Sequence, residues 1–173
     1  MSNEILVIDD NSDIRKLISG ILQDRGYIVR QAANYDQALL EIKKKLPDVA
    51  IVDVKLDKGD NDGIELLVHL KKLSDDIPVI MISGHANVQM AVDSLKLGAF
   101  EFIQKPFDQE RLMNFINRAI ENFELKNENK LSLKADNSDF NLLCLPTDNF
   151  PTFADEFEGP DTLSVRGLSL IHI

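Results

Sequence analysis

Three aspartates, a serine and a lysine each come at the end of a short apolar run of this sequence. Asp9 and Asp10 follow ILVI, Asp53 follows VAIV, Ser83 follows VIMI, and Lys105 closes FIQK. Crowded carboxylates suit a hard divalent cation such as Mg²⁺, and an aspartate can attack a phosphoryl group to form an acyl phosphate. A lysine and a hydroxyl would neutralise charge on the phosphoryl oxygens. Together these side chains predict Mg²⁺-dependent phosphoryl transfer.

The apolar runs alternate with segments of helical period, which predicts the elements that position these side chains. Strands are expected over 4–8, 27–31, 49–52, 79–82 and 100–103, and helices over 13–24, 35–45, 63–73, 88–97 and 108–125. This alternation is typical of an α/β protein whose parallel sheet is covered on both faces. Ligands of such open sheets bind at the carboxyl ends of the strands. The five side chains would therefore converge if the first, third, fourth and fifth strands are neighbours.

The composition of the 173 residues argues against several classes of function. A formal net charge of -10 does not suit a general nucleic-acid or membrane-surface binder, because both need basic patches. Cys144 is the single cysteine, so no internal disulfide can form. No apolar run approaches the roughly 20 residues that cross a bilayer, and the first ten residues read as a mature N-terminus. We therefore expect a cytoplasmic protein with no membrane contact.

The chain changes character after residue 126. Residues 127–173 hold eight acidic and three basic residues and follow neither the helical nor the strand period. We expect one domain over 1–126 and a linker or disordered tail over 127–167. The last six residues, LSLIHI, match the translation of CTG TCT CTT ATA CAC ATC, the end sequence of a transposase used in preparing sequencing libraries. Residues 168–173 are therefore expected to be an adaptor artefact.

Each of the chemical features has an ordinary interpretation when it is taken alone. Paired acids after a strand usually lie in a loop or cap a helix, and Asp53 alone is a common kind of strand-end residue. Ser83 is a frequent turn residue, and Lys105 before Pro106 marks a helix boundary. The order of these residues and their joint position at strand ends favour a functional site.

Roughly residues 3–125 resemble the receiver domain of two-component response regulators. The motifs that carry the resemblance are VIDD at 7–10, IVDV at 51–54, MISGH at 81–85 and FIQKPF at 102–107. The resemblance implies a flavodoxin-like (βα)5 fold, with a doubly wound parallel sheet in the strand order 2-1-3-4-5. It also implies that a sensor histidine kinase or a phosphotransfer protein donates a phosphoryl group to Asp53.

The resemblance assigns a role to each site residue. Mg²⁺ would be bound by Asp9 or Asp10, by Asp53 and by the backbone carbonyl of Lys55. Ser83 would bind a phosphate oxygen and Lys105 would pair with the phosphate. Phe102 would be the aromatic switch residue, and the Lys105–Pro106 peptide bond would be cis. Residues 88–125, as helix 4, strand 5 and helix 5, would form the surface through which the chain forms a homodimer on phosphorylation.

A longer stretch resembles one group of these regulators more closely. The segment DVKLDKGDNDG, from Asp53 to Gly63, is longer than in many receivers and lacks their proline. With MISGHANVQMAV and LKLGAFEFIQKPF, it is similar to nitrogen-regulation regulators of the NtrX type. In those proteins a sigma-54-activating ATPase and a DNA-binding helix-turn-helix follow the receiver. This chain has no Walker-type glycine loop and no basic recognition helix. We therefore expect neither ATPase activity nor DNA contact from it, and control of transcription only in a full-length protein.

Two other functions are left open by the residues. The first is a stand-alone, phospho-dependent interaction module. The second is a Mg²⁺-dependent phosphatase of the haloacid dehalogenase type, which needs an acid two residues after its nucleophile. Asn11 stands at that position if Asp9 is the nucleophile, so the pattern fails there. The receiver interpretation predicts no enzyme in the ordinary sense, with phosphorylation and dephosphorylation of Asp53 only.

Overall fold

A computed structural model of the protein describes residues 3–57, 59, 61–85 and 87–140. The strands are β1 (Glu4–Ile8), β2 (Ile28–Ala32), β3 (Val49–Asp53), β4 (Val79–Ser83) and β5 (Glu101–Gln104). The helices are α1 (Ser12–Asp24), α2 (Tyr35–Lys44), α3 (Asp62–Leu73), α4 (Val88–Lys96) and α5 (Gln109–Phe140). The chain divides into two units, Met1–Ala135 and Asp136–Ile173, and the fold described below belongs to the first.

The five strands are all parallel and lie in the order β2-β1-β3-β4-β5. This is the flavodoxin-like order expected from the sequence, and it is confirmed. The order makes β1, β3, β4 and β5 consecutive neighbours. Because the strands are parallel, their carboxyl ends all lie along one edge of the sheet. Within the described residues, no helix combines the length and the apolar character that crossing a bilayer requires.

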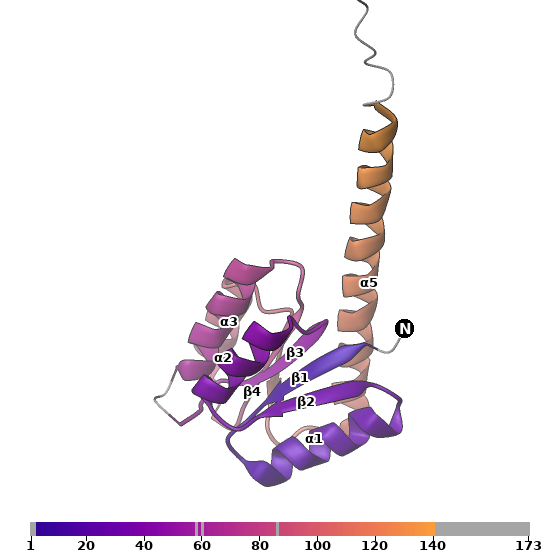
Figure 1. Ribbon diagram of the computed structural model, residues 1–173. Helices are drawn as coiled ribbons and strands as arrows, with labels where there is room; N and C mark the ends of the chain where they lie inside the picture. The colour runs from indigo at the N-terminus through magenta and orange to yellow at the C-terminus, as the bar shows by residue number, and fades with distance from the viewer. Residues whose placement is uncertain (1–2, 58, 60, 86, 141–173) are drawn as a thin grey trace, which may run out of the picture. The chain divides into compact units, whose positions relative to one another are not determined.

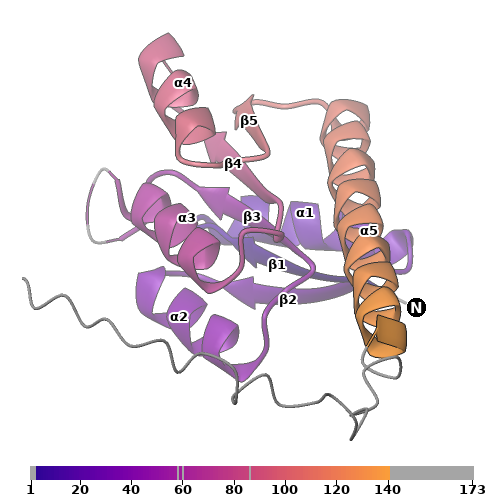
Figure 2. The same cartoon turned by 90° about the horizontal axis from the view of Figure 1, so that it is seen from above.

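Two apolar cores lie on opposite faces of the sheet. Helices α2 and α3 cover one face and α1 and α5 cover the other (Figures 1 and 2). Successive strand residues point to opposite faces. In β1, Leu6 and Ile8 therefore pack in the core under α2 and α3, whereas Ile5 and Val7 pack in the core under α1 and α5. Since all four side chains are buried, the strand reads as a continuous apolar run rather than an alternating one.

Asparagine and glycine mark the ends of several helices. The side chain of Asn11 caps α1, that of Asn34 caps α2 and that of Asn87 caps α4, each by accepting backbone N–H groups of the first turn. Gly26 and Gly98 follow α1 and α4 with φ values of 84° and 98°. Only glycine adopts this left-handed conformation readily, so both residues favour the end of their helix.

The structure differs from the predicted boundaries by one residue at many element ends and by more at the end of α5. β2 and β5 each begin and end one residue later than predicted. β3 and β4 each extend one residue past the apolar run, because Asp53 pairs with Ile82 and Ser83 with Gln104 in the ladder. The last helix was predicted to end at 125, whereas α5 continues to Phe140. Residues 127–140, expected to begin a linker or disordered tail, are therefore helical. Residues 141–173, which include the expected adaptor artefact, lie outside the described residues.

Candidate functional site

Three carboxylates meet at the carboxyl edge of the sheet. Asp9 and Asp10 directly follow β1, and Asp53 is the last residue of β3, the strand that pairs with β1. One carboxylate oxygen from each residue lies within 4.8 Å of the others. Asp9 and Asp53 are buried, with 2% and 6% of their surface exposed, whereas Asp10 is exposed. These donors, one of them open to solvent, fit the oxygen ligands that a hard cation such as Mg²⁺ prefers.

The ammonium group of Lys105 bridges two of these carboxylates. Its Nζ donates to Asp9 Oδ2 at 2.7 Å and to Asp53 Oδ2 at 2.5 Å. The backbone N–H of Lys105 donates to the carbonyl of Ser83 at 2.8 Å, which extends the pairing of β4 with β5 and holds Lys105 at this edge. Burial alone would lower the pKa of Lys105, but the hydrogen bonds to Asp53 and Asp9 outweigh it and raise that pKa. Lys105 is therefore a fixed positive charge.

The charge of Asp53 depends on its neighbours. Burial raises the pKa of the Asp53 carboxyl above its ordinary value, and the nearby Asp9 carboxylate acts in the same direction. The hydrogen bond from Lys105 opposes both effects. The backbone N–H of Lys55 donates to Asp53 Oδ1 at 3.2 Å, so each carboxylate oxygen has a donor. A cation at this edge of the sheet is what favours the ionised form of Asp53.

Local hydrogen bonds hold Asp9 in place. Its Oδ1 accepts the backbone N–H of Asn11 at 2.9 Å, and its backbone carbonyl accepts the Arg15 guanidinium at 2.6 Å. Its own N–H donates to the carbonyl of Ala32 in β2 at 3.2 Å. Sequence reasoning missed Arg15. It lies in α1, six residues after Asp9, whose carbonyl it contacts. Asp9 is thus tied to β2, to α1 and to Lys105.

Ser83 ends β4 with its hydroxyl in the same region, and 3% of the residue is exposed. Its Oγ accepts the backbone N–H of His85 at 3.3 Å and donates to the Met90 sulfur at 3.9 Å. Among the described residues these are the partners of the hydroxyl, and neither is a carboxylate of the site. The side chain is close to the acidic cluster but is bonded to the start of α4.

Phe102 and Pro106 lie on β5 and just beyond it. Phe102 pairs in register with Met81 of β4, and its ring packs, partly buried, against the core under α2 and α3. Met90 of α4 packs against the same core. The peptide bond between Lys105 and Pro106 is cis. Phe102 therefore lies on the same face of the sheet as Met90.

Gly63, in the first turn of α3, permits a close approach to Asp53 that sequence reasoning also missed. A Cβ atom at Gly63 would lie 1.9 Å from the Asp53 carbonyl oxygen and 2.8 Å from the Val54 Cα. The Gly63 N–H donates to the Val54 carbonyl at 3.0 Å. Any larger residue would push the backbone that carries Asp53 away from α3. A DG pair before an apolar run is an ordinary helix start, so its sequence carries no sign of this contact.

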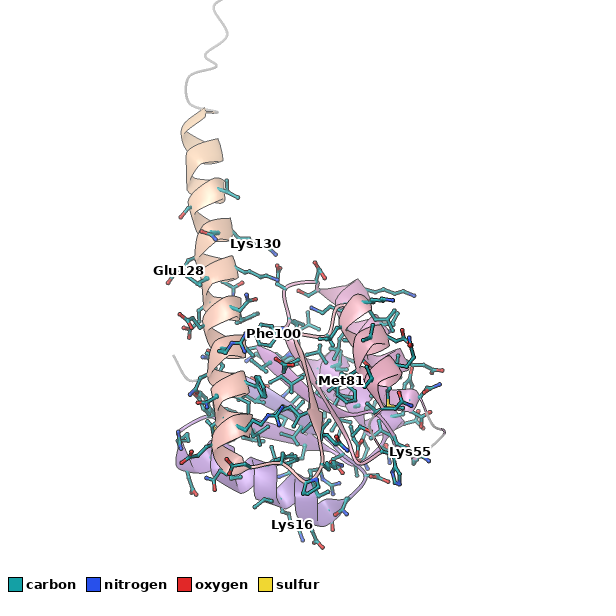
Figure 3. All side chains as sticks on the ribbon, turned by 180° about the vertical axis from the view of Figure 1, so that it is seen from behind. Lys16, Lys55, Met81, Phe100, Glu128 and Lys130 are labelled. Atoms are coloured by element: carbon teal, nitrogen blue, oxygen red, sulfur yellow. The ribbon has the colours of Figure 1, made fainter. Side chains whose placement is uncertain are left out.

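A cavity of about 500 Å³ opens over these residues. Its lining includes Asp10, Asp53, Ser83 and Lys105, together with Lys55, His85 and Met90. Figure 3 shows Lys55 at the far end of the domain from Lys130 of α5. The cavity carries both acidic and basic groups, and it is large enough for a tetrahedral anion with a metal ion beside it.

A parallel (βα)5 sheet with an acidic cluster and a lysine at its carboxyl edge defines a receiver domain. Residues 5–117 match the family model of the response regulator receiver domain, and the chain belongs to this family. It is similar to the nitrogen assimilation regulatory protein NtrX of Azorhizobium caulinodans, with 43% identity over 128 residues, covering 74% of this chain and 28% of that protein. The chain spans about a quarter of the length of the curated NtrX relatives it matches.

Solved structures agree with this assignment. The receiver domain of NtrX from Brucella abortus is 44% identical, with a TM-score of 0.64, covering 68% of this chain and 98% of that chain. The solution structure of the beryllofluoride-activated NtrC4 receiver domain dimer is 37% identical, with a TM-score of 0.65, covering 69% of this chain and 98% of that chain. The resemblance to receivers of the NtrX type is confirmed. The haloacid dehalogenase interpretation gains no support, because Asn11 caps α1 instead of supplying a second acid.

Proposed function

We propose that the domain is a phosphorylation switch in which Asp53 accepts a phosphoryl group from a sensor histidine kinase or a histidine phosphotransfer protein. The supporting observation is the contact of 2.5 Å between Asp53 Oδ2 and Lys105 Nζ, beside two further carboxylates. A buried carboxylate with a cation on one oxygen is held as a nucleophile while its charge is partly balanced. Membership of the receiver family points to the same residue.

The chemistry follows from the groups around Asp53. A carboxylate oxygen of Asp53 attacks phosphorus, and the P–N bond of the phosphohistidine breaks with its electron pair going to the imidazole. Lys105 lies where it can pair with a phosphoryl oxygen, and the Ser83 hydroxyl lines the same cavity. Positioning and charge neutralisation supply most of the catalysis in phosphoryl transfer, so these groups suffice without a general base.

We further infer that Asp10, Asp9 and Asp53 hold Mg²⁺, with the backbone carbonyl of Lys55 as a further ligand. The bound ion would neutralise charge on the phosphoryl oxygens. Asp10 is the exposed member of the cluster and carries no restraint from Lys105, so it is free to turn toward an incoming ion. Asp9 and Asp53 each bond Lys105 through Oδ2, and their Oδ1 atoms, which accept backbone N–H groups, each keep a further lone pair for a metal ion.

Labelling with a small phosphodonor tests the proposal. Acetyl phosphate with Mg²⁺ is expected to place one phosphoryl group on Asp53, located by mass spectrometry after borohydride reduction. Asp53→Asn should not label, whereas Asp57→Asn, an exposed acid of the same loop, should label like the wild type. Labelling of Asp53→Asn, or a phosphoryl group found on another residue, would refute the assignment. Continuous turnover of a generic phosphate ester would favour a phosphatase instead.

The output surface is proposed to be formed by α4, β5 and α5. Val92, Leu95 and Leu97 are exposed apolar residues in and after α4. On α5, the Arg118 guanidinium lies 5.9 Å from the ring centroids of both Phe100 and Phe115. An apolar patch beside an arginine on aromatic rings is a composition common in protein interfaces. The related NtrC4 receiver is a dimer when activated by beryllofluoride, and we propose that phosphorylation promotes a homodimer of this chain too.

Analytical ultracentrifugation tests this part separately. Beryllofluoride with Mg²⁺ is expected to shift the wild type toward the dimer at micromolar concentration and to leave Asp53→Asn unchanged. An equal mass with and without beryllofluoride would count against a dimer switch, while the labelling result would stand. By analogy with the longer relatives, we propose that such a switch controls transcription, in nitrogen regulation, through a partner domain absent from the described residues.

A further inference from the structure

Met90 connects the cavity around Asp53 with α4. It lies in the first turn of α4, and its side chain lines the cavity together with Ser83 and Lys105. Its sulfur accepts the Ser83 hydroxyl at 3.9 Å, while the Ser83 Oγ accepts the N–H of His85. The Ser83 hydroxyl is therefore bonded toward α4, and among the described residues no carboxylate of the site is its partner.

The backbone of Met90 is held firmly at both of its polar groups. Its N–H donates to the capping side chain of Asn87 at 2.7 Å, and its carbonyl accepts the hydroxyl of Ser94 at 2.8 Å. Ser94 is fully buried. Because these bonds fix Met90 to the first two turns of α4, a displacement of the Met90 side chain acts on the helix. Met90 also packs against the same core as Phe102.

We infer that Met90 is a positioning residue, whose thioether holds the Ser83 hydroxyl toward α4 until Asp53 is phosphorylated. This inference rests on the proposed function. A thioether is a weak acceptor, whereas a phosphoryl oxygen is charged and accepts roughly twice as strongly as a neutral group. Ser83 therefore exchanges the sulfur for the phosphoryl group when that group is present. The exchange breaks a direct link between β4 and α4.

Packing alone would not produce this exchange. Methionine fills irregular gaps in many cores, and a Met→Leu substitution keeps nearly the same volume while it removes the acceptor sulfur. A residue that only fills space should tolerate that substitution without any effect on phosphoryl binding. The substitution therefore separates packing from restraint of the Ser83 hydroxyl.

Beryllofluoride titration of the whole chain at fixed Mg²⁺ and fluoride gives the first test. Losing one weak hydrogen bond from the resting state corresponds to about 0.5–1 kcal/mol, and Met90→Leu should bind the analogue about two- to fivefold more tightly than the wild type. Met81→Leu is the matched control, because Met81 is fully buried in β4 (Figure 3), and it should bind like the wild type. In a Ser83→Ala background, Met90→Leu should have no effect on binding.

The methionine methyl resonances give a second readout, measured without beryllofluoride. Ser83→Ala should move the ¹³Cε signal of Met90 and leave in place that of Met113, a buried residue of α5 in the core on the opposite face of the sheet. Equal affinity of Met90→Leu and wild type, or an effect that persists without the Ser83 hydroxyl, would overturn the inference. If the wild type binds no beryllofluoride, the proposed function itself fails. If the wild type binds it and Met90→Leu binds it with the same affinity, only the inference about Met90 fails.

Discussion

At Gly63, the backbone of the site leaves no room for a larger side chain. The Cβ of an alanine there would overlap the Asp53 carbonyl oxygen, at 1.9 Å. We expect Gly63→Ala to lower the free energy of unfolding by about 2–3 kcal/mol and to abolish labelling of Asp53, because the backbone must move to relieve the overlap. Chemical denaturation and acetyl phosphate labelling measure the two effects.

Gly20 supplies the matched control for that substitution. It lies within α1, and a Cβ atom there would meet nothing within 4 Å. Gly20→Ala should therefore stabilise the protein, by about 0.5–1 kcal/mol, since alanine favours a helix more than glycine does. Equal effects of the two substitutions would show that the contact of Gly63 with Asp53 is not a close one.

Residue type and position in the sequence were enough to predict that Asp9, Asp10, Asp53, Ser83 and Lys105 lie at one edge of the sheet. Each follows an apolar strand, and strand ends of a parallel sheet gather at one edge. The same reasoning missed three residues that act across elements, namely Arg15, Gly63 and Met90. Their contacts depend on how a helix lies on the sheet. The local sequence pattern of one helix turn does not indicate which strand that turn faces.

At the scale of elements, the N-terminal caps of the helices differ in how much they contribute to the stability of the protein. Asn34 begins α2, and its side chain accepts the N–H of Gln37 at 2.9 Å. Asn61 begins α3 without any such side-chain bond. We expect Asn34→Ala to cost about 1 kcal/mol of stability and Asn61→Ala only a few tenths, as measured by urea denaturation. A larger cost at Asn61 would mean that its side chain, not its place in the chain, supports the loop after Asp53.

Helix α5 extends further along the chain than its local sequence pattern predicts. Its apolar periodicity stops near residue 125, and the polar residues that follow favour a linker as much as a helix. The helix nevertheless continues, and Lys130 pairs with Asp76 in the turn between α3 and β4. That pairing lowers the pKa of Asp76. A contact between residues this far apart in the sequence cannot be read from the composition of either segment.

At the scale of the whole molecule, stability should depend on pH through Glu4. Glu4 is buried in β1 and pairs with Arg30 of β2 and with Lys45. Burial alone would raise the pKa of Glu4, but the Lys45 and Arg30 cations outweigh it and lower that pKa. The folded protein therefore keeps the carboxylate charged at a pH where the unfolded chain is already protonated. The stabilisation is complete above the ordinary carboxyl range and is lost as the pH falls through the lowered pKa.

Comparison of Glu4→Gln with the wild type across pH measures that contribution. We expect the variant to be less stable by about 1–3 kcal/mol at neutral pH, because a charge-assisted hydrogen bond is lost. The difference should shrink steadily in acid. Glu121→Gln, on an exposed part of α5, should differ little from the wild type at any pH. A Glu4→Gln difference that is constant with pH would assign the loss to packing instead of charge.

Magnesium should also act on the whole molecule, by mass action. In the proposed metal site, Mg²⁺ would bind the folded protein and not the unfolded chain, so it should raise the melting temperature. The gain in stability is about 1.4 kcal/mol at a free concentration ten times the dissociation constant. Asp10→Asn should reduce the shift strongly, whereas Asp24→Asn, exposed at the end of α1, should not. A wild type whose melting temperature is unchanged by millimolar Mg²⁺ would show that the three acids form no metal site.

The sheet was predictable to within a residue or so because its strands are short and bounded by helices of clear period, and because β1, β3 and β4 are fully buried. Strand order came instead from the family resemblance, since the apolar pattern of β1 is the same whichever strand lies beside it. The precise ends of β3 and β4 were not predictable. There the ladder continues through Asp53 and Ser83, polar residues whose types favour loops.

The bridge from Lys105 to Asp9 and Asp53 affects how the site responds to the concentration of divalent ions. An ammonium tethered to the chain has a local concentration that dilution cannot lower. At low concentrations of divalent ions, the buried Asp9 and Asp53 carboxylates keep the Lys105 ammonium as their counter-ion. This charge reduces the mutual repulsion of the two carboxylates in the folded protein. In the proposed metal site, Mg²⁺ would compete with the Lys105 ammonium for the Asp9 and Asp53 oxygens, so its apparent affinity would depend on the strength of these two ion pairs.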